Sequence, residues 1–295
     1  MFLNENKQII TDHISESEND TELFMSEINN ALFLMLENPT EEEIKKFRDR
    51  RDALLVGWLA TLMGDLQGDY YQSAQIGIDV ADEQLKAKNI KTVANKNITK
   101  GTFTSKVDNS INSLSQDLTA ITESIKANSE RIIKELKSSP TANTLTEQKK
   151  ISSELVAQLK EKGITFFTDK IGRKTPIEKY IKMRVFTDTV TLQRTSYFVR
   201  AIQYGVDLVR IRHLNIHPEC ELCIPFNNKI LSINGKTPGY MTIEDAQMHG
   251  LFHPNCDHVP EELELAPEDK GGEGVIILND KNKERLAYNK KNTVL

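Results

Sequence analysis

Hydrophobic residues near the start of the chain recur at helical spacing. Between residues 20 and 37 the apolar positions lie three or four apart, which predicts an amphipathic helix that ends at Pro39. Thr40 and Glu43 then form a capping-box pattern, so a second helix is expected to begin there and to run to about residue 88. Glycines inside this helix weaken it and leave a break into two helices open. These glycines are Gly57, Gly64, Gly68 and Gly77.

A second periodic pattern lies in a stretch rich in Ser, Thr, Asn and Lys between residues 93 and 140. Its apolar residues alternate in spacing between three and four, as in a coiled-coil seam that has Asn128 at one core position. Because such a seam is not stable alone in water, we expect it to pack on another helix of the same chain or, as the alternative, on a partner protein. The seam consists of Val107, Ile111, Leu114, Leu118, Ile121, Ile125 and Ile132.

Shorter elements separated by turn signals are expected in the C-terminal half. The pattern predicts a helix over 146–163, a strand over 164–168 and a long helix that begins at Thr175-Pro176 and ends before Gly205. Further strands are predicted over 206–211 and 229–233, and a short helix over 242–250. The second of these strands is followed by Asn234-Gly235, a hairpin turn signal.

Composition excludes several classes of protein. The chain has 295 residues, 27% of them charged, with 14 Gly and 9 Pro, which does not fit a collagen-like, mucin-like or wholly disordered chain. The N-terminus lacks the pattern of a secretory signal, and the longest apolar run, 53–64, is too short to span a membrane. Three cysteines cannot form a disulfide framework. We therefore expect no membrane span and synthesis in a reducing cytoplasm.

Charge is distributed unevenly along the chain. Residues 1–92 carry a net charge of -9, residues 160–212 a net charge of +7, and residues 213–265 a net charge of -6. The basic segment 160–212 could face the phosphates of DNA. The alternative is a solvated face whose basic side chains are balanced by nearby acids, because the basic residues do not form one compact run.

Cysteine and histidine are concentrated in one part of the chain. All three cysteines and five of the six histidines lie between His213 and His258. Two turns each offer two ligands separated by two residues, a spacing that lets four side chains meet at one tetrahedral ion, and thiolates favour zinc. The predicted ligands of a closed, structural Zn²⁺ site are Cys220, Cys223, His253 and Cys256, with His258 and His217 as alternates or as hydrogen-bonding neighbours of the ligands.

The same residues allow three other interpretations. Cys220 and Cys223 could form a redox pair, although a thioredoxin-like strand and helix do not flank them. The cysteines could also be ordinary buried thiols, which their clustering disfavours. A catalytic zinc would need an open position and a nearby acid or base. The acids available for that role are Glu219, Glu221, Glu244 and Asp257, and none of them stands out.

The chain from Gly163 onward resembles the phage minor capsid protein type 2 family, within the broader Mu F-like head morphogenesis group. An ordered series of motifs carries the resemblance, which is more specific than either cysteine pair alone. Asp257 stands where the family commonly has arginine. The motifs are Gly163-Ile-Thr-Phe-Phe-Thr-Asp169-Lys-Ile-Gly172-Arg173, Tyr180-Ile-Lys-Met183, Gly205-Val-Asp-Leu-Val, Cys220-Glu-Leu-Cys223-Ile-Pro225, Lys229-Ile-Leu-Ser-Ile-Asn-Gly235 and Gly250-Leu-Phe-His253-Pro-Asn-Cys256-Asp-His258.

This resemblance implies a non-enzymatic, low-copy structural protein of a tailed phage head. Its implied place is the portal vertex, where it would assist head assembly, DNA packaging or DNA delivery. The implied partners are the portal protein, other head proteins and further copies of the chain, with packaged DNA as a possible contact of the basic segment. The protein would be made in the host cytoplasm and reside in the virion.

Together the patterns predict an α+β protein with a mainly helical N-terminal arm and a small C-terminal α/β module stabilised by zinc. Four regions follow: an acidic helical region over 1–92, a helical segment with the seam over 93–150, a head-morphogenesis-like module over 151–265, and a tail over 266–295. Two alternatives remain. One is a zinc-stabilised HNH-like endonuclease, for which His213 and His249 are the general-base candidates. The other is a non-viral zinc adaptor.

Overall fold

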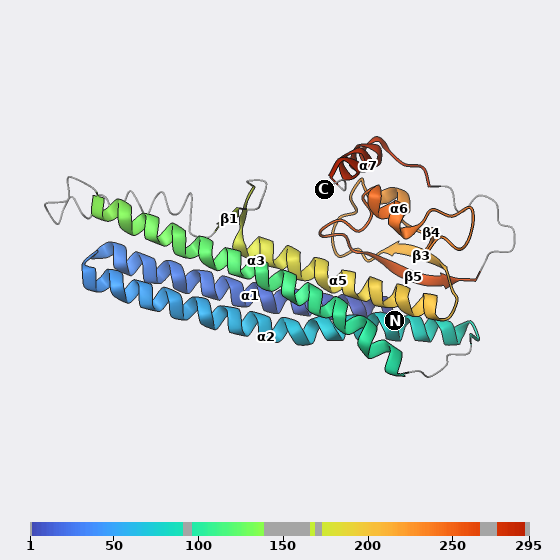
Figure 1. Cartoon of the computed structure of the whole chain (residues 1–295), viewed down its shortest axis with the longest axis horizontal. Helices are drawn as coiled ribbons and strands as arrows, with labels where there is room; N and C mark the ends of the chain where they lie inside the picture. The colour runs from blue at the N-terminus through green and yellow to red at the C-terminus, as the bar shows by residue number, and fades with distance from the viewer. Residues whose placement is uncertain (1, 91–95, 139–165, 169–172, 266–275, 293–295) are drawn as a thin grey trace. The chain divides into compact units, whose positions relative to one another are not determined.

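A computed structural model describes residues 2–90, 96–138, 166–168, 173–265 and 276–292 of the chain (Figure 1). By its internal contacts the chain forms two compact units. Residues 14–67 and 110–184 form the first, called here the helical unit. Residues 1–13, 68–109 and 185–295 form the second, called here the sheet unit. These units follow contacts in space, whereas the four predicted regions follow composition along the chain.

Four long helices contribute residues to both units. They are α1 (Phe2–Glu37), α2 (Glu41–Ala87), α3 (Lys96–Ser138) and α5 (Ile177–Gln203). α1 begins well before the predicted stripe, and α2 continues without a break through all four of its glycines. The predicted start of α2 is confirmed, because the Glu43 amide donates to the Thr40 hydroxyl at 3.2 Å.

The helical unit buries the stripes that the periodicity predicted. Leu114, Leu118, Ile121 and Ile125 of α3 are fully buried, so the seam packs within the chain. The polar residue buried in this seam is Ser129 rather than Asn128. Other buried side chains come from α1 and α2, and Trp58 stacks on Phe24 with ring centroids 4.5 Å apart.

One ion cluster joins α2 to α3 in the helical unit. Arg48 binds the Glu130 carboxylate through two nitrogens, and Arg51 donates to the same carboxylate at 2.8 Å and to the Ser129 hydroxyl at 2.9 Å. These contacts hold the pKa of Glu130 at about 2, because hydrogen bonds from Arg48 outweigh the effect of partial burial and Arg51 adds to them. The unit also contains a short antiparallel pair, β1 (Phe166–Thr168) and β2 (Lys174–Pro176). The predicted helix over 146–163 lies outside the described residues.

A three-stranded antiparallel sheet in the order β4-β3-β5 organises the sheet unit. Its strands are β3 (Leu208–His213), β4 (Lys229–Ser232) and β5 (His258–Glu264), and no strand was predicted at β5. One hydrophobic core joins this sheet to α2 and α5 through Ala81, Leu85, Tyr197 and Ala201. The described helices include none that combines the length and apolar character required to cross a membrane.

Close packing of α2 on α5 depends on Gly77. A Cβ at this position would lie 2.1 Å from the carbonyl oxygen of Gln193, whereas a Cβ at Gly57, Gly64 or Gly68 would meet nothing within 4 Å. Gly77 is thus required by a helix contact, and the other three glycines of α2 are not.

The Asn234-Gly235 turn does not make the predicted β-hairpin. Gly235 has the positive φ expected of such a turn, but the following residues reach only an isolated parallel bridge between Ser232 and Thr242. The reason is Asp207, whose buried carboxylate accepts from the Ser232 hydroxyl and from the backbone amides of Asn234 and Thr237. The turn therefore folds back around this carboxylate and does not pair strands.

Two short helices complete the sheet unit. α6 (Ile243–Met248) begins at Thr242, whose hydroxyl accepts from the Asp245 amide, as predicted. Residues 266–295 were expected to be a tail, yet they include α7 (Asp280–Asn292). α7 packs against α6, and Asn282 is fully buried with its amide donating to the carbonyls of Leu222 and His249. The physical reason for the difference is that amide hydrogen bonds, which leave no hydrophobic pattern, attach this helix.

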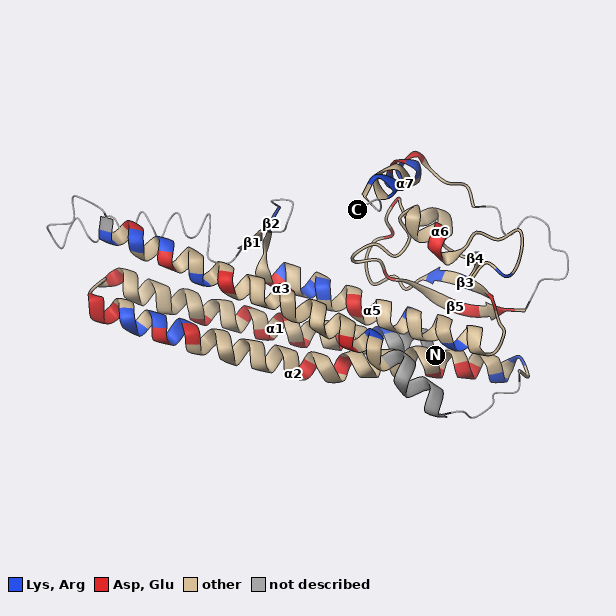
Figure 2. Ribbon diagram, in the orientation of Figure 1, with Lys and Arg blue, Asp and Glu red and all other residues tan. Residues whose placement is uncertain are grey.

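Most described basic side chains of the segment 160–212 meet carboxylates or carbonyls. Figure 2 shows basic residues on α5 and β3, and acidic residues on the elements around them. Arg194 is buried among backbone carbonyls. This arrangement agrees with the alternative of a balanced face. The ion pairs are Lys182–Glu18, Arg184–Asp117, Arg200–Asp82, Arg210–Glu264 and Arg212–Glu261.

Candidate metal centre

Two tight turns of the sheet unit carry the predicted ligands. The first lies between β3 and a short 3₁₀ helix (Ile224–Phe226), and it closes with the Cys223 amide donating to the Cys220 carbonyl at 2.9 Å. The second lies before β5 and closes in the same way from the Cys256 amide to the His253 carbonyl, also at 2.9 Å. Each turn therefore places residues i and i+3 side by side, which is the arrangement that the spacing predicted.

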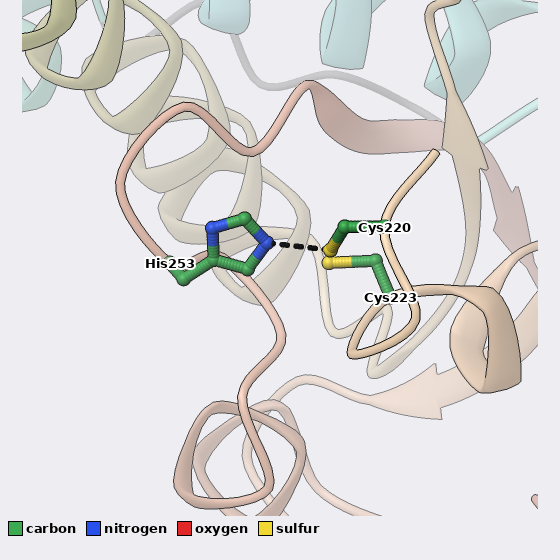
Figure 3. Close-up of side chains that lie close together, drawn as sticks. All are labelled: Cys220, Cys223 and His253. Atoms are coloured by element: carbon green, nitrogen blue, oxygen red, sulfur yellow. Dashed lines mark hydrogen bonds between the residues drawn. The ribbon is translucent and has the colours of Figure 1, made fainter. Parts of the chain in front are cut away.

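The two turns bring their side chains together. Cys220 Sγ lies 2.9 Å from His253 Nε2, and Figure 3 shows the ring of His253 directed at the two sulfurs of the first turn. Cys223 Sγ lies 3.5 Å from Cys256 Sγ. Ligand atoms of Cys220, Cys223 and His253 fall within 4.8 Å of one another, as do those of Cys223, Cys256 and His258. The structure thus gathers three thiols and two imidazoles, of which a tetrahedral ion would use four.

Hydrogen bonding orients the two histidines differently. His253 Nδ1 lies 2.6 Å from the carbonyl of Pro254, so it donates there and leaves Nε2 as the nitrogen that faces Cys220. His258 directs Nδ1 toward Cys256 Sγ at 3.6 Å and Nε2 toward Glu219 at 3.4 Å. His253 therefore has the second hydrogen bond that is typical of a ligating imidazole.

The pKa values of the two buried thiols, Cys223 and Cys256, are shifted in opposite directions. A hydrogen bond from Cys223 lowers the pKa of Cys256, against the effect of burial, and His258 and Arg194 lower it further. The hydrogen bond to Cys256 and burial both raise the pKa of Cys223. Cys256 is thus the first thiolate of the pair, and a bound cation would favour the second.

Arg194 of α5 is the cation beside this cluster. It is 3% exposed, and its guanidinium donates to the carbonyl of His258 at 3.2 Å and lies 4.2 Å from the centroid of the Phe252 ring. Burial lowers the pKa of Arg194, while the charges of Cys256, Cys223 and Asp257 raise it. Sequence reasoning placed Arg194 only in the basic segment, since nothing local marks a buried arginine.

Asp257 holds the polypeptide next to the cluster. Its Oδ2 accepts from the amides of Ile216 at 2.8 Å and His217 at 3.1 Å, and its side chain is 3% exposed. The carboxylate that stands where the family commonly has arginine therefore organises a turn. His217 forms a T-shaped pair with the Phe186 ring and belongs to neither cysteine-containing group among the described residues.

The residues proposed for nuclease or catalytic-zinc chemistry are placed as follows. His213 ends β3, as an HNH base would, but it is buried beside Asp257. His249 caps α6, and its Nδ1 lies 2.7 Å from the Asp245 carbonyl. A general base must reach the proton that it removes, so burial of His213 does not favour that role. Glu221 pairs with Lys281, and Glu244 is an exposed residue of α6.

Fold and site together define a mainly helical α+β protein whose small antiparallel module is built around a compact cysteine–histidine cluster. The chain belongs to the phage minor capsid protein 2 family, whose sequence profile matches residues 41–268. This match covers about three quarters of the chain, from α2 to just beyond β5, and confirms the resemblance. Membership supports a structural role in the phage virion, with other head proteins as partners. No curated protein and no solved structure matches the chain.

Proposed function

We propose that this protein is a low-copy, non-enzymatic component of a tailed phage head that associates with the portal vertex and assists head assembly, DNA packaging or DNA delivery. Family membership over residues 41–268 is the observation that carries the proposal. In this proposal the protein is made in the host cytoplasm and incorporated into the head during assembly.

A structural Zn²⁺ held by Cys220, Cys223, Cys256 and His253 is part of the same proposal. Four protein ligands fill a tetrahedral zinc and leave no position for substrate, which suits a structural ion. The hydrogen bond from His253 to Pro254 and the neighbouring charge of Arg194 support this ligand set. When bound, the ion would join the turn after β3 to the turn before β5 and so close the small sheet.

The helical unit supplies the surface for head proteins in this proposal. Leu23 of α1 and Val56 of α2 are 64% and 68% exposed, although both are large and apolar. A groove of about 410 Å³ is lined by apolar residues that include Leu23, Phe24 and Trp58 and by the charged residues Asp20, Glu27 and Arg50. Because basic side chains of 160–212 are engaged with carboxylates, we assign this protein's contacts to protein partners rather than to packaged DNA.

Virion composition tests the proposal. The chain, carrying an epitope tag, is supplied during infection, and purified virions are probed for the tag and imaged at the portal vertex. We expect a few tagged copies per virion and recovery of the portal protein when the tag is captured from disrupted heads. Absence from purified virions would contradict the proposal.

A paired set of variants tests the zinc. Cys220→Ser combined with Cys256→Ser should abolish zinc binding by the thiolates and impair incorporation into heads, whereas His249→Ala, which changes a histidine outside the cluster, should retain both. Metal-free wild-type protein together with normal assembly of the double variant would refute the structural zinc.

A plasmid-cleavage assay with Mg²⁺ or Mn²⁺ addresses the nuclease alternative, and cleavage lost in His213→Ala would favour the nuclease over a structural role.

A further inference from the structure

Next to the cysteine cluster lies a second group of ligand-type side chains that contains no sulfur. It consists of His213 at the end of β3, His258 at the start of β5, and Asp257 immediately before it. His213 and His258 are directly opposite each other in the β3–β5 register, and their ring centroids lie 4.8 Å apart. Residues that are directly opposite each other in an antiparallel pair project their side chains to the same face of the sheet.

All three side chains are buried, and each of the two histidines has an unsatisfied ring nitrogen. The side chains of His213, Asp257 and His258 are 6%, 3% and 1% exposed. His213 Nε2 and His258 Nε2 are buried without a hydrogen-bond partner among the described residues. Buried polar atoms without partners are rare in folded proteins, and an absent ion is one of the recognised explanations.

Hydrogen bonds elsewhere on each ring determine which nitrogen faces the group. His213 Nδ1 lies 2.9 Å from the Asn215 side-chain oxygen, and His258 Nδ1 lies 3.6 Å from Cys256 Sγ. If each Nδ1 donates to that acceptor, each Nε2 carries a lone pair. Asp257 uses Oδ2 for two backbone amides, which leaves Oδ1 directed at the histidines.

The separation between His213 and Asp257 is that of two ligands of one ion. His213 Nε2 and Asp257 Oδ1 are 2.8 Å apart, and the pair does not have the geometry of a hydrogen bond. Two ligands at right angles around one transition metal, each bonded at roughly 2.0–2.2 Å, are about 3 Å apart, which agrees with the observed separation.

We propose that His213, Asp257 and His258 form a second site, for a divalent first-row transition metal, distinct from the thiolate site. Two imidazoles and one carboxylate are a donor set that suits Zn²⁺, Mn²⁺ or Fe²⁺. Glu219, 3.4 Å from His258 Nε2, adds negative charge at its edge. The proposal assigns His258 to this site through Nε2 and leaves His253 as the imidazole of the thiolate site.

Burial gives this second ion a structural role. It would tie the end of β3 to the start of β5, next to the turn whose amides Asp257 accepts. The thiolate site and this site would thus stand on either side of residues 256–258, joined through Cys256 and its contact with His258.

Cobalt titration of the reduced, metal-free full chain tests the proposal, because Co²⁺ reports its ligands spectroscopically. We expect two equivalents per chain. One should show thiolate-to-cobalt charge transfer, and the other should show ligand-field absorption without it. His213→Phe should lose the second equivalent and keep the first, and His249→Ala should keep both. The double variant Cys220→Ser, Cys256→Ser should lose the charge-transfer signal, so failure of the zinc proposal is seen separately.

X-ray absorption of the zinc-loaded wild-type chain gives a measurement that does not depend on whether His213→Phe folds. Two sites should give more nitrogen and oxygen than sulfur neighbours per zinc on average, whereas one site with three cysteines should give a sulfur-rich environment. Binding of only the equivalent that shows thiolate charge transfer, or a second equivalent that His213→Phe retains, would overturn the proposal. So would a protonated His213 ring, seen by NMR, in the fully metal-loaded chain.

Discussion

The helical unit and the sheet unit are stabilised by different kinds of contact. In the helical unit, regular apolar stripes such as Leu114, Leu118 and Ile121 are buried along whole helices. In the sheet unit, strands of four to seven residues are joined by buried polar groups, notably Asp207, Arg194 and Asp257. The first kind of contact is spread over many residues, while the second is concentrated in a few. Loss of one group should therefore have a much larger effect in the sheet unit.

Removal of the proposed zinc should give the largest difference in stability between the two units. Structural zinc contributes roughly 10 kcal/mol or more to the folding of small domains. Chelation under reducing conditions should therefore lower hydrogen-exchange protection in β3 and β5 at least about a hundredfold, while α3 amides near Ile121 keep theirs. Exchange followed by mass spectrometry measures both in one sample. An equal loss of hydrogen-exchange protection in both units would contradict the expected difference. As the control, His249→Ala should respond to chelation as wild type does.

A cavity in the helical unit should lower the stability of that unit and leave the proposed metal sites of the sheet unit unchanged. Leu118 is fully buried, so Leu118→Ala should reduce the free energy of unfolding by about 2–5 kcal/mol, through lost burial and the cavity left behind. The adjacent exposed residue gives the control, because Thr119→Ala should change stability by no more than about 0.5 kcal/mol. Urea denaturation measures stability, and metal content should stay unchanged. Loss of metal in Leu118→Ala would show that the units are not independent.

Two glycines of α2 provide a finer test. Gly77→Ala forces a methyl group against the Gln193 carbonyl and should destabilise the sheet unit by about 1–3 kcal/mol. Gly64→Ala meets open space and should stabilise α2 by about 0.5–1 kcal/mol, because alanine is the better helix former. Thermal unfolding of both variants measures the pair. A stabilising Gly77→Ala would show that α2 and α5 can separate there without cost.

Acid should weaken the ion cluster at Glu130 in the helical unit, which is the smallest effect expected. The pKa of Glu130 is lowered to about 2, so its stabilising contribution is complete above the pKa of the unfolded chain, near 4.3, and is lost as the pH falls toward 2. Because Glu130 is 42% exposed, we expect less than about 1 kcal/mol from this pair. Glu130→Gln should flatten stability against pH in that window. A variant with unchanged pH dependence would contradict this origin.

Periodicity and spacing along the chain predicted the parts of the molecule that depend on local pattern. The seam of α3, the cap at Thr40 and the start of α6 at Thr242 are confirmed. The two turns that the spacing suggested place Cys220 beside His253 and Cys223 beside Cys256, while the four-ligand zinc set stays a prediction. Such features need only residues close in sequence or a chemically distinctive side chain.

The features that could not be predicted depend on partners far away in the chain. β5 carries charged residues because Glu261 and Glu264 meet Arg212 and Arg210 of β3, so its sequence lacks a typical strand pattern. α7 is attached through Asn282. The turn at Asn234 folds around Asp207, 27 residues earlier. In each case the two partners are far apart in the sequence, so neither periodicity nor composition reveals that they meet.

Asn282 should also influence the rate at which a bound ion dissociates. Its amide bridges the carbonyl of Leu222, beside Cys223, and that of His249, in the segment that leads to His253. We expect the proposed zinc between the two turns to leave when they move apart, which should require that this amide release one of them. The dissociation rate of the zinc should then depend on how often α7 undocks. Exchange of labelled metal would therefore measure the frequency with which α7 detaches.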